Sequence, residues 1–560
     1  MGQQLDTIKK LVDNRDIIAT VLRGARSTSF IRHKGIFSKL LEVRAEENPN
    51  RVGLIFENGG HYADDQLTYA MLDANSKRMA WALRKEGFER GDKIAMVMRN
   101  HPEFIYALAA CSMLGAALVP IDPRAKGERL SYMLGDSDAK AVMTTADLLP
   151  EVEAASAEVP GLSKIYLSLK PDADKALASR YRTTNEWLER REVFAIEDRV
   201  EQTRAPVQII YTSGVTGNPK GVALDSQRNM MYCLLGFLVW DYQPDDRLYT
   251  GLSLAHGNAQ AVTLLPGLSM RLPVVISQRF TKSRIWDVCR RYGCTTFSLL
   301  GGMMSGIYNE PPRPDDGVNP VRMVISAGTP NAIWREFERR FDVNILEWYG
   351  AIEGGLAFKP VGEGPQGSFG KPIPGIMEMK VVDEEDNEVP PGISGELISR
   401  MATKNAVEYY KKPEASAEKT RGGWLRSGDI VHRDADGWLY FDYRKGGALR
   451  RSGDFIKPDL VERVIGEHPD VSEVCVYGIP AASGAPGESD LVAAVVPFKG
   501  NKIDAGSIFK AAAKNLERNS VPSYIQVVGE IPKSPSEKHL DRILKEAFSP
   551  DADNVHELKE

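Results

Sequence analysis

The sequence predicts a mixed α/β protein with a large N-terminal domain and a small, mobile C-terminal α+β domain. Residues 35–150 and 205–350 alternate strand and helix patterns, which is typical of parallel sheets covered by helices. From about residue 365, Gly and Pro become frequent and short alternating strands follow, which predicts a small β-barrel-like unit. The N-terminal domain is therefore expected to contain two parallel αβ-sandwich subdomains and this β unit.

The N-terminal elements follow from the spacing of apolar residues. Residues 78–86 predict an amphipathic helix that stops at Gly87, and residues 104–114 predict a nearly all-apolar helix. Short apolar runs predict strands at residues 93–98, 116–121, 208–211, 271–276, 322–326 and 343–347. The segment from Cys233 to Trp240 is apolar but short, so we interpret it as a core or pocket helix.

The C-terminal elements are shorter and more interrupted. Alternating patterns predict strands at residues 377–382, 395–399, 437–441, 474–478 and 491–496, and a helix at residues 507–519. Paired glycines follow Arg444 and Lys445, and glycine permits large φ/ψ changes at low steric cost. We therefore expect an N-terminal domain at residues 1–445, a hinge at residues 446–447 and a mobile domain at residues 448–560.

The composition indicates a soluble globular protein. The chain has 560 residues, of which 42% are hydrophobic and 26% charged, so it requires more than one core. A net charge of −5 argues against a general nucleic-acid binder. The five cysteines are few and mostly far apart, which favours a reducing, cytoplasmic compartment. No signal peptide and no transmembrane span are predicted.

The most informative segment is residues 211–222, which follow the apolar strand at residues 208–211. Glycines allow backbone N–H groups to turn toward an anion, and hydroxyl and ammonium groups add donors without negative charge. The segment supplies Thr212, Ser213, Gly214, Thr216, Gly217, Lys220 and Gly221. It differs from the P-loop pattern because Pro219 precedes Lys220 and Gly221 follows it. Taken alone, it indicates a phosphate site or a surface turn.

This loop resembles the signature of the adenylate-forming superfamily, which includes acyl-CoA synthetases, luciferases and peptide-synthetase adenylation domains. Further segments resemble later motifs of that superfamily, and together they cover nearly the whole chain from about residue 35. They are Ser253–Asn258, Ser326–Pro330, Tyr349–Glu353, Trp424–Asp429, Asp442–Arg444 and Pro532–Lys538. The resemblance implies that residues 1–445 form an adenylation domain that uses ATP, Mg²⁺ and coenzyme A.

The resemblance also assigns roles to particular residues. It implies that Glu353 holds Mg²⁺, that Asp429 accepts the ribose hydroxyls, and that Lys538 neutralises charge at the reacting oxygens. The residues that it places in catalysis are Lys538, Thr212, Glu353 and His256. Those that it places around the nucleotide or CoA are Thr212, Ser213, Gly214, Thr216, Gly217, Lys220, Gly328, Thr329, Trp348, Tyr349, Gly350, Asp429, Arg444 and Gly453.

Four positions depart from the superfamily pattern. Val215 and Ile352 stand where hydroxyl residues are common, Gly446 stands where Asp or Lys is usual, and Glu537 stands where glycine is common before the lysine. These departures bear on the rate and on the substrate but not on the chemistry. The segment Gly257–Ala259 lacks the aspartate with which amino-acid-activating relatives hold an α-amino group, which argues against an amino-acid substrate.

The expected function is ATP-dependent acyl-CoA synthesis through an acyl-adenylate. The expected partners are a small carboxylic acid, ATP and CoA, with no nucleic acid, and a homodimer is one of the open assembly states. The segments expected to line the acyl pocket, residues 232–240, 256–259 and 299–304, are apolar and favour a bulky fatty, steroid-like or carnitine-like acid. Three alternatives stay open: transfer to a carrier-protein phosphopantetheine, a luciferase-like oxygenase, and a non-catalytic nucleotide-binding paralogue.

Overall fold

The computed structural model describes most of the chain, and its contacts divide the chain into two compact units. The described residues are 32–170, 175–196, 205–212, 218–401, 407–445, 449–451, 454–456, 458–481, 489–516, 518–534, 537 and 539–558. The first unit comprises Met1–Ser298, Pro320–Ile325 and Ala406–Thr420, and the second comprises Leu299–Asn319, Ser326–Asn405 and Arg421–Glu560. The predicted hinge at residues 446–447 lies outside the described residues, so the predicted domain boundaries stay a prediction.

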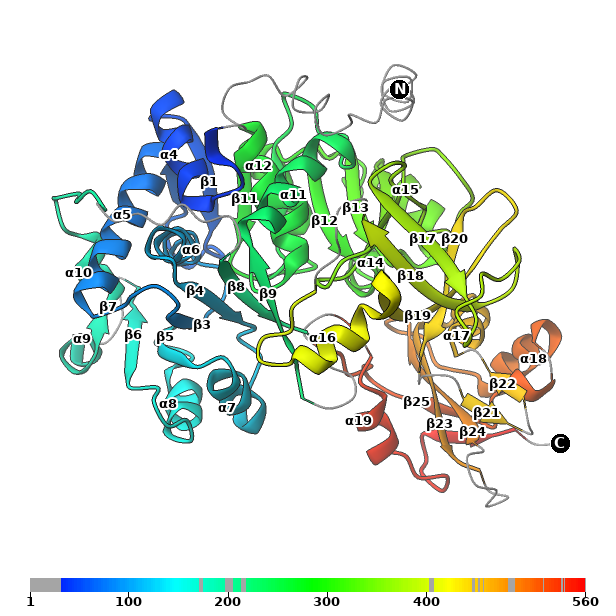
Figure 1. The fold of residues 1–560 in the computed structure, drawn as a ribbon. Coiled ribbons are helices and arrows are strands. Elements are labelled where there is room, and N and C mark those ends of the chain that lie inside the picture. The colour runs from blue at the N-terminus through cyan, green and yellow to red at the C-terminus, as the bar shows by residue number, and fades with distance from the viewer. Residues whose placement is uncertain are drawn as a thin grey trace. The chain divides into compact units, whose positions relative to one another are not determined.

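A seven-stranded sheet forms the centre of one part of the first unit (Figure 1). Its order is β7 (Arg182–Thr183), β6 (Lys164–Ser168), β5 (Ala139–Thr145), β3 (Lys93–Val97), β4 (Ala117–Ile121), β8 (Pro206–Tyr211), β9 (Gly221–Asp225). All neighbours are parallel except β8 and β9, which are antiparallel. The central strands are buried along almost their whole length, as expected of apolar runs covered on both faces. The predicted parallel sheet is therefore confirmed.

A second parallel group in the first unit has the order β12 (Thr296–Leu300), β10 (Leu248–Thr250), β11 (Val274–Ser277), β1 (Val52–Glu57), with β2 (Asp65–Thr68) antiparallel at its edge. The strand predicted to begin at Arg271 begins at Val274. Arg271 instead ends α12 (Leu265–Met270) with a φ of 62°, in the left-handed region that closes helices. Strand β13 (Met323–Ala327) agrees with the predicted strand at residues 322–326.

The predicted helices of the first unit are confirmed, and their ends have local causes. The amphipathic helix is α5 (Tyr69–Lys85), in which the Thr68 hydroxyl caps the Met71 N–H at 3.2 Å. The all-apolar helix is α6 (Pro102–Leu114), which is buried on every side and ends at Gly115 with a φ of 70°. The remaining helices are α4 (Phe37–Glu47), α7 (Gly127–Asp136), α8 (Leu149–Ala157), α9 (Lys175–Arg180), α10 (Thr184–Leu188), α11 (Ser226–Leu238), η1 (Ala259–Leu264) and α13 (Ile285–Tyr292).

The N-terminal part of the second unit is mostly antiparallel. One group is β14 (Asn344–Gly350), β15 (Leu356–Lys359) and β16 (Lys371–Pro372); another is β17 (Met377–Val382), β18 (Gly395–Met401), β19 (Leu425–Arg433) and β20 (Leu439–Arg444). The strand predicted to begin at Gly437 begins at Leu439, because Gly437 lies in a turn with a φ of 85°. The helical segments here are α14 (Gly301–Tyr308), η2 (Asn331–Ile333), α15 (Trp334–Phe341) and η3 (Arg421–Gly423), while α16 (Pro413–Lys419) belongs to the first unit.

The C-terminal part of the second unit is a small α+β structure with its own core. The sheet order is β23 (Val471–Pro480), β24 (Ser489–Pro497), β25 (Tyr524–Val527), β26 (Val555–Glu557), preceded in the chain by the hairpin β21 (Leu449–Arg451) and β22 (Asp454–Ile456). Apolar residues of α17 (Pro458–Gly466) and α18 (Ala505–Asn515) pack on one side, and those of α19 (Asp541–Glu546) on the other. A short η4 (Arg518–Ser520) precedes β25. The predicted small α+β domain is thereby confirmed.

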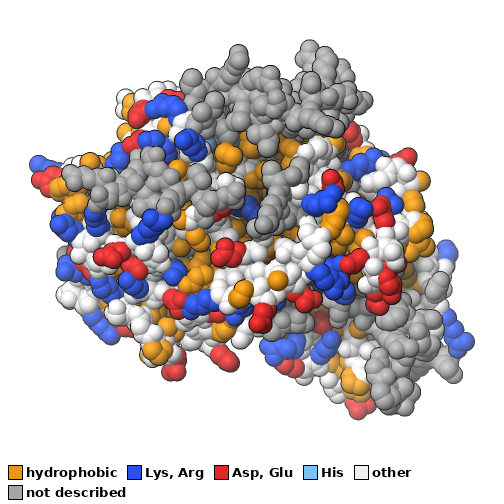
Figure 2. All heavy atoms as spheres, in the orientation of Figure 1, with side chains coloured by type: hydrophobic (Ala, Val, Ile, Leu, Met, Phe, Trp, Pro, Cys, Tyr) orange, Lys and Arg blue, Asp and Glu red, His pale blue; other side chains and the backbone are white. Residues whose placement is uncertain are grey.

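Three general features of the described residues concern the surface charge, the cysteines and the apolar helices. On the face shown in Figure 2, basic and acidic side chains are interspersed, in keeping with the mild net charge of −5. All five cysteines are buried and none is in a disulfide. None of the helices in the described ranges combines the length and the apolar composition that crossing a bilayer requires.

Candidate active site

The predicted phosphate loop is flanked by two strands that pair as a β-hairpin in the first unit. Strand β8 turns back into β9, and Tyr211 opposite Gly221 is the last pair of the ladder. The Thr212 N–H then donates to the Lys220 carbonyl at 2.9 Å, and the Lys220 N–H donates to the Thr212 hydroxyl at 3.2 Å. Sequence analysis missed the return strand β9. In a P-loop a helix follows the phosphate loop, whereas here a strand follows it. Ser213, Gly214, Val215, Thr216 and Gly217 lie outside the described residues.

The base of this hairpin is held from outside by a segment about 190 residues further along the chain. The Ala223 N–H donates to the Glu408 carbonyl at 2.9 Å, and the Tyr410 N–H donates to the Gly221 carbonyl at 2.8 Å. The Lys220 ammonium lies 5.3 Å from the centroid of the Tyr409 ring, within the range of a cation–π contact. The exposed Lys220 is thus placed at the start of the loop by tertiary contacts that the local sequence does not encode.

His256 is oriented by a carboxylate at the end of a neighbouring strand. Its Nε2 lies 2.8 Å from Asp122 Oδ2, and Asp122 directly follows β4. Asp122 also accepts hydrogen bonds from the Arg124 N–H at 2.8 Å and from the Arg124 guanidinium at 3.1 Å. Burial opposes ionisation, but these donors hold the pKa of Asp122 well below its usual range. Asp122 is therefore a charged acceptor that fixes the His256 ring, and sequence analysis missed it.

In the second unit, Asp429 lies between a tyrosine and an arginine. The Tyr349 hydroxyl donates to Asp429 Oδ2, and Arg444 Nη1 donates to Oδ1 at 2.7 Å. The register of β19 against β20 explains the second contact, because Asp429 stands opposite Arg444. Burial and the neighbouring carboxylate raise the pKa of Tyr349 well above its usual range, so its hydroxyl stays a donor. Tyr349 and Arg444, from two predicted motifs, thus both contact the carboxylate of Asp429, which belongs to a third.

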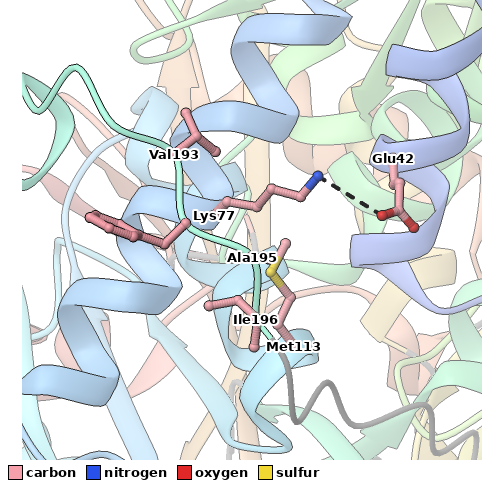
Figure 3. A pocket seen from close by; sticks show the side chains of 7 residues that line it. Glu42, Lys77, Met113, Val193, Ala195 and Ile196 are labelled. Carbon is pink, nitrogen blue, oxygen red and sulfur yellow. Dashed lines mark ion pairs between the residues drawn. The ribbon is translucent and has the colours of Figure 1, made fainter.

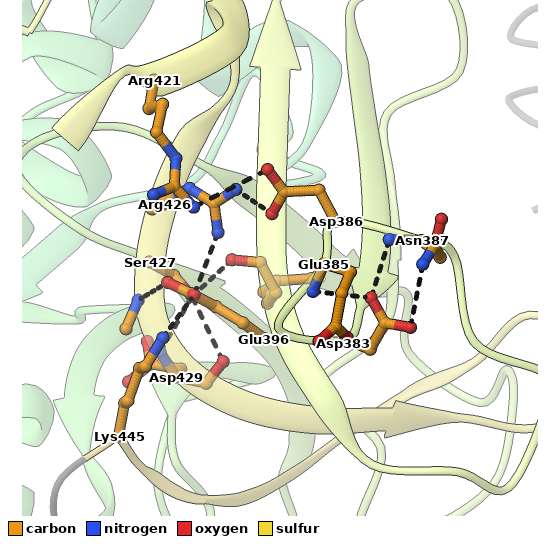
Figure 4. Close-up of polar contacts among 12 residues, drawn as sticks. Asp383, Glu385, Asp386, Asn387, Glu396, Arg421, Arg426, Ser427, Asp429 and Lys445 are labelled. Atoms are coloured by element: carbon orange, nitrogen blue, oxygen red, sulfur yellow. Dashed lines mark hydrogen bonds and ion pairs between the residues drawn. The ribbon is translucent and has the colours of Figure 1, made fainter. Parts of the chain in front are cut away.

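The Asp429 turn is stabilised by Glu396, a buried carboxylate of β18 that sequence analysis did not identify. Its oxygens accept from the Gly428 N–H, the Arg426 guanidinium and the Lys445 ammonium, each at 3.2 Å (Figure 4). Arg426 also pairs with Asp386 on the other side. Glu396 therefore connects the turn before Asp429 to the residue that immediately precedes the predicted hinge.

A second buried carboxylate organises the loop that contains Gly328 and Thr329. Glu347, in the middle of β14, accepts from the Gly328 N–H at 2.7 Å, from the Thr329 N–H at 3.3 Å and from the Thr329 hydroxyl. Its burial raises its pKa to about 7, although these donors favour the ionised form. Gly328 has a φ of 76°, so the turn uses the left-handed region that glycine adopts without strain.

The remaining residues of the tyrosine motif have distinct surroundings. Gly350 leaves room for the indole of Trp348, because a Cβ at Gly350 would lie 2.7 Å from Trp348 Cζ3. Trp348 itself is buried, which indicates a packing role. Glu353 is half-buried in a turn closed by reciprocal hydrogen bonds between Ala351 and Gly354, at 3.3 and 3.0 Å.

Lys538 and Gly453 lie outside the described residues, but the neighbours of Lys538 are placed. Lys533 pairs with Glu473 of β23, and His539 Nε2 lies 3.6 Å from the same carboxylate. Glu537 has a φ of 60°, a conformation that glycine adopts at no cost and other residues rarely adopt. The predicted departure from glycine therefore falls at a position whose backbone favours glycine.

The segments expected to line the acyl pocket serve different roles. Trp240 is fully buried and its indole N–H donates to the Ala261 carbonyl at 3.0 Å, so it belongs to the core of the first unit. Gly302 of α14 lies beside the C-terminal lysine loop, because a Cβ there would be 3.2 Å from Lys533 Nζ and 3.4 Å from Glu537 Oε2. This part of the predicted pocket wall thus borders the loop that precedes Lys538.

A separate cavity of about 300 Å³ lies in the first unit, and none of the residues that line it is among those predicted for the site. It is lined by Met113, by residues 193–196, and by Lys77 and Glu42, whose charged groups are 3.9 Å apart (Figure 3). Lys77 also pairs with Asp73 at 2.7 Å. The charges that face this cavity are therefore satisfied within α4 and α5.

Comparison of the sequence with protein families gives two matches. The profile of the family described as "AMP-binding enzyme" matches residues 41–410. The profile described as "AMP-binding enzyme C-terminal domain" matches residues 460–538. The first match covers more than half of the chain and includes the hairpin loop, His256 and the tyrosine motif.

Curated relatives are CoA ligases of varied substrates. The chain is 29% identical to a medium/long-chain-fatty-acid–CoA ligase, FadD17, of Mycobacterium marinum, over 88% of this chain and 93% of that ligase. It is 29% identical to a sulfoacetate–CoA ligase of Cupriavidus necator, over 89% and 95%. It is 27% identical to an indoleacetate–CoA ligase of Aromatoleum aromaticum, over 84% and 91%.

Solved structures with the same fold include an anthranilate CoA ligase, AuaEII, in complex with anthranoyl-AMP. Its TM-score is 0.80 at 22% identity, covering 91% of this chain and 96% of that one. An O-succinylbenzoate coenzyme A synthetase, MenE, from Bacillus subtilis, in complex with ATP and magnesium ion, has a TM-score of 0.75 at 25% identity, covering 90% and 99%. The mixed α/β fold with a small C-terminal domain is thus shared with these enzymes.

Proposed function

Because this chain belongs to the AMP-binding enzyme family, we propose that it is an AMP-forming acyl-CoA synthetase. In this reaction the carboxylate of an acid attacks the α-phosphorus of ATP, pyrophosphate leaves, and an acyl-adenylate forms. The thiol of CoA then attacks the acyl carbon and AMP leaves. The match of both family profiles, together with CoA-ligase relatives that cover 84–89% of the chain, supports this proposal.

The observation that carries the proposal is the arrangement at Asp429. A buried carboxylate that already accepts from Tyr349 and Arg444 has further lone pairs for the two ribose hydroxyls of a nucleotide. Arg444, whose side chain is 47% exposed, can pair with Asp429 and still reach a phosphate or ribose oxygen. We assign Asp429, Tyr349 and Arg444 to nucleotide binding.

The other described residues supply the groups that ATP requires. Thr212 and the exposed Lys220 offer donors for phosphate oxygens at the mouth of the hairpin loop. Glu353 offers a hard oxygen ligand of the kind that Mg²⁺ prefers. When bound, Mg²⁺ would neutralise negative charge on the phosphates. Gly328 and Thr329, held by Glu347, are assigned to the adenine side, and Ser213, Gly214, Thr216 and Gly217 complete the proposed loop.

Lys538 is assigned to the first half-reaction only. A carboxylate must approach a polyanion there, and an ammonium at the reacting oxygens lowers that repulsion. Lys533 and His539, on either side of Lys538, both contact Glu473, which anchors the ends of this loop on β23. Gly453 is assigned to the passage for the thiol, and rotation about residues 446–447 is proposed to exchange the two arrangements.

For the acid we propose a bulky hydrophobic carboxylate. The support is the composition of the segments expected to line the pocket, since residues 232–240, 256–259 and 299–304 contain no Asp, Glu, Lys or Arg and are mostly apolar. Relatives that act on fatty acid and indoleacetate fit this class, whereas the relative that acts on sulfoacetate takes a small acid with a second charge. For the compartment we propose the cytoplasm, since five buried, unpaired thiols suit a reducing environment.

Pyrophosphate release across a panel of acids, with and without CoA, tests the proposal. Fatty, aryl-acetic, bile-type and short dianionic acids separate the substrate classes, and phosphopantetheinylated carrier protein replaces CoA in one arm. We expect release with a bulky apolar acid and thioester formation with free CoA. If no acid of the panel caused pyrophosphate release in the presence of MgATP, that result would contradict the enzyme assignment.

Variants of Lys538 test the residue assignment. Lys538→Ala is expected to lower acyl-adenylate formation by at least about 100-fold, while thioester formation from synthetic acyl-adenylate and CoA continues. The matched control is Lys545→Ala, a surface lysine of the same domain that pairs with Asp541. Equal loss in both half-reactions would show that the lysine acts through folding, and unchanged adenylation would overturn its role.

A further inference from the structure

Three side chains to which the proposed reaction assigns no catalytic role converge at the edge of the C-terminal sheet. Glu462 comes from α17, Cys475 from the edge strand β23, and His539 from the segment just before α19. One ligand atom of each, a carboxylate oxygen, the thiol sulfur and a ring nitrogen, lies within 4.8 Å of the others. Sequence analysis did not group them, because they are separated by 13 and 64 residues.

Two of the three members are held by further contacts. The Val476 N–H, on the open edge of β23, donates to Glu462 Oε1 at 2.7 Å. His539 Nδ1 lies 4.0 Å from Glu462 Oε1, while its Nε2 lies 3.6 Å from Glu473 Oε1. One ring nitrogen thus faces the cluster and the other faces a second carboxylate. Metal-bound histidines show this arrangement, since a carboxylate on the far nitrogen fixes the ring and its tautomer.

The donor set selects the class of ion. A thiolate, an imidazole and a carboxylate together are ligands for Zn²⁺ and similar soft or borderline cations, and three protein ligands leave a fourth position for water. Mg²⁺, which the adenylation reaction uses, prefers an all-oxygen octahedral set and would not compete well here. Cys475 is 2% exposed, and its sulfur lies within 4.8 Å of the ligand atoms of Glu462 and His539.

We propose that Glu462, Cys475 and His539 form a Zn²⁺-class binding site on the C-terminal domain. Zinc–ligand bonds of about 2.0–2.3 Å place tetrahedral ligands about 3.5 Å apart, so ligand atoms that now lie within 4.8 Å of one another must approach by up to roughly 1 Å. The side chains of Glu462 and His539 are 22% and 31% exposed, which leaves a path for the ion and its water. Binding displaces the thiol proton of Cys475 into solvent and forms the sulfur–metal bond.

The proposal extends beyond the adenylation chemistry and does not depend on it. A purely structural cluster would be satisfied by the contacts already named and would bind no ion. The two interpretations differ in one measurable respect, which is the formation of a sulfur–metal bond at Cys475. Co²⁺ reports that bond directly, because thiolate ligation gives an intense charge-transfer absorption in the near ultraviolet that carboxylate or imidazole ligation lacks.

The experiment titrates the full-length protein, stripped with a chelator, with Co²⁺ and then with Zn²⁺. We expect one Co²⁺ per chain, a thiolate charge-transfer band, and displacement by stoichiometric Zn²⁺ but not by millimolar Mg²⁺. Cys475→Ser is expected to abolish the band. The matched control is Cys233→Ser, at a buried thiol of the first unit that donates to the Leu265 carbonyl at 3.8 Å and lies outside the cluster. That variant should bind as the wild type does.

If Cys475→Ser does not fold, a second variant at a partly exposed residue still tests the proposal. Glu473 is partly exposed and lies behind His539, so Glu473→Gln should fold and weaken Zn²⁺ or Co²⁺ binding by about 10- to 100-fold. Unaltered affinity in Glu473→Gln, a Co²⁺ spectrum without a thiolate band, or a band that persists in Cys475→Ser would each overturn the proposal.

Discussion

Glu347→Gln offers a quantitative test of the buried carboxylate that holds the Gly328–Thr329 loop. The side chain is 3% exposed and accepts two backbone N–H bonds, at 2.7 and 3.3 Å, besides the Thr329 hydroxyl. Burial outweighs these donors and raises its pKa from 4.5 to about 7. The substitution keeps the size and one acceptor oxygen but removes the titration.

The sign of the effect follows from the direction of the shift. Between about pH 4.5 and pH 7 the folded protein carries a proton on Glu347 that the unfolded chain has lost. The free energy of unfolding must then fall as the pH rises through this window. For pKa values of 4.5 and about 7, the loss between about pH 5 and about pH 8 is roughly 2.5 kcal/mol. The neutral amide of the Glu347→Gln variant contributes no such dependence.

Urea unfolding followed by circular dichroism at about pH 5 and about pH 8 measures this difference. The wild-type protein should lose roughly 2.5 kcal/mol more than Glu347→Gln over that interval. Glu336→Gln, an exposed glutamate of α15 paired with Arg339, is the control and should behave as the wild type. Identical pH dependence in wild type and Glu347→Gln would refute the reasoning, because it would mean that the donors keep Glu347 ionised throughout.

Three further substitutions test other parts of the site. Gly221→Ala would place a Cβ 2.7 Å from the nearest side-chain atom, so it should lower the free energy of unfolding by about 1–3 kcal/mol in urea titrations; an unchanged midpoint would contradict this packing. Arg444→Lys replaces the Nη1 bond of 2.7 Å to Asp429 and should weaken ATP binding at least about tenfold by calorimetry, whereas equal affinity would remove Arg444 from the site. Asp122→Asn removes the charge that orients His256, so it should raise the KM for the acid by about 3- to 10-fold and change the KM for ATP little. Equal changes in both KM values would refute a role for His256 in binding the acid.

Local patterns sufficed for much of the fold. The all-apolar run that became α6, its stop at Gly115, and the Val- and Ile-rich strands β3 and β4 each carry their signal within a dozen residues. The errors at Arg271 and Gly437 were errors of strand boundary, where a left-handed residue ended a helix or made a turn before the strand could start. Such boundaries depend on backbone conformation that composition does not specify.

Residues of the candidate site were predicted only where they belong to a recognisable sequence motif. Glu347, Glu396 and Asp122 act through contacts 18 to 134 residues away, so no local spacing reveals them. A weak signal existed for Glu347, since a lone charge inside the apolar strand at residues 344–350 requires partners. The return strand β9 had no comparable signal in the sequence. Its outer edge is covered by Glu408 and Tyr410, and these residues come from a distant segment that local spacing does not reveal.

The division into two compact units has a consequence for how the protein is made. The chain passes from one unit to the other five times, after residues 298, 319, 325, 405 and 420. Residues 408–410, which cover the outer edge of the hairpin below the phosphate loop, are therefore synthesised after most of the first unit and much of the second. Since domains form as their segments emerge, this edge stays open during translation until residue 410 has left the ribosome. A nascent chain stopped before that point would expose an unpaired strand and invite capture by chaperones or by another nascent chain.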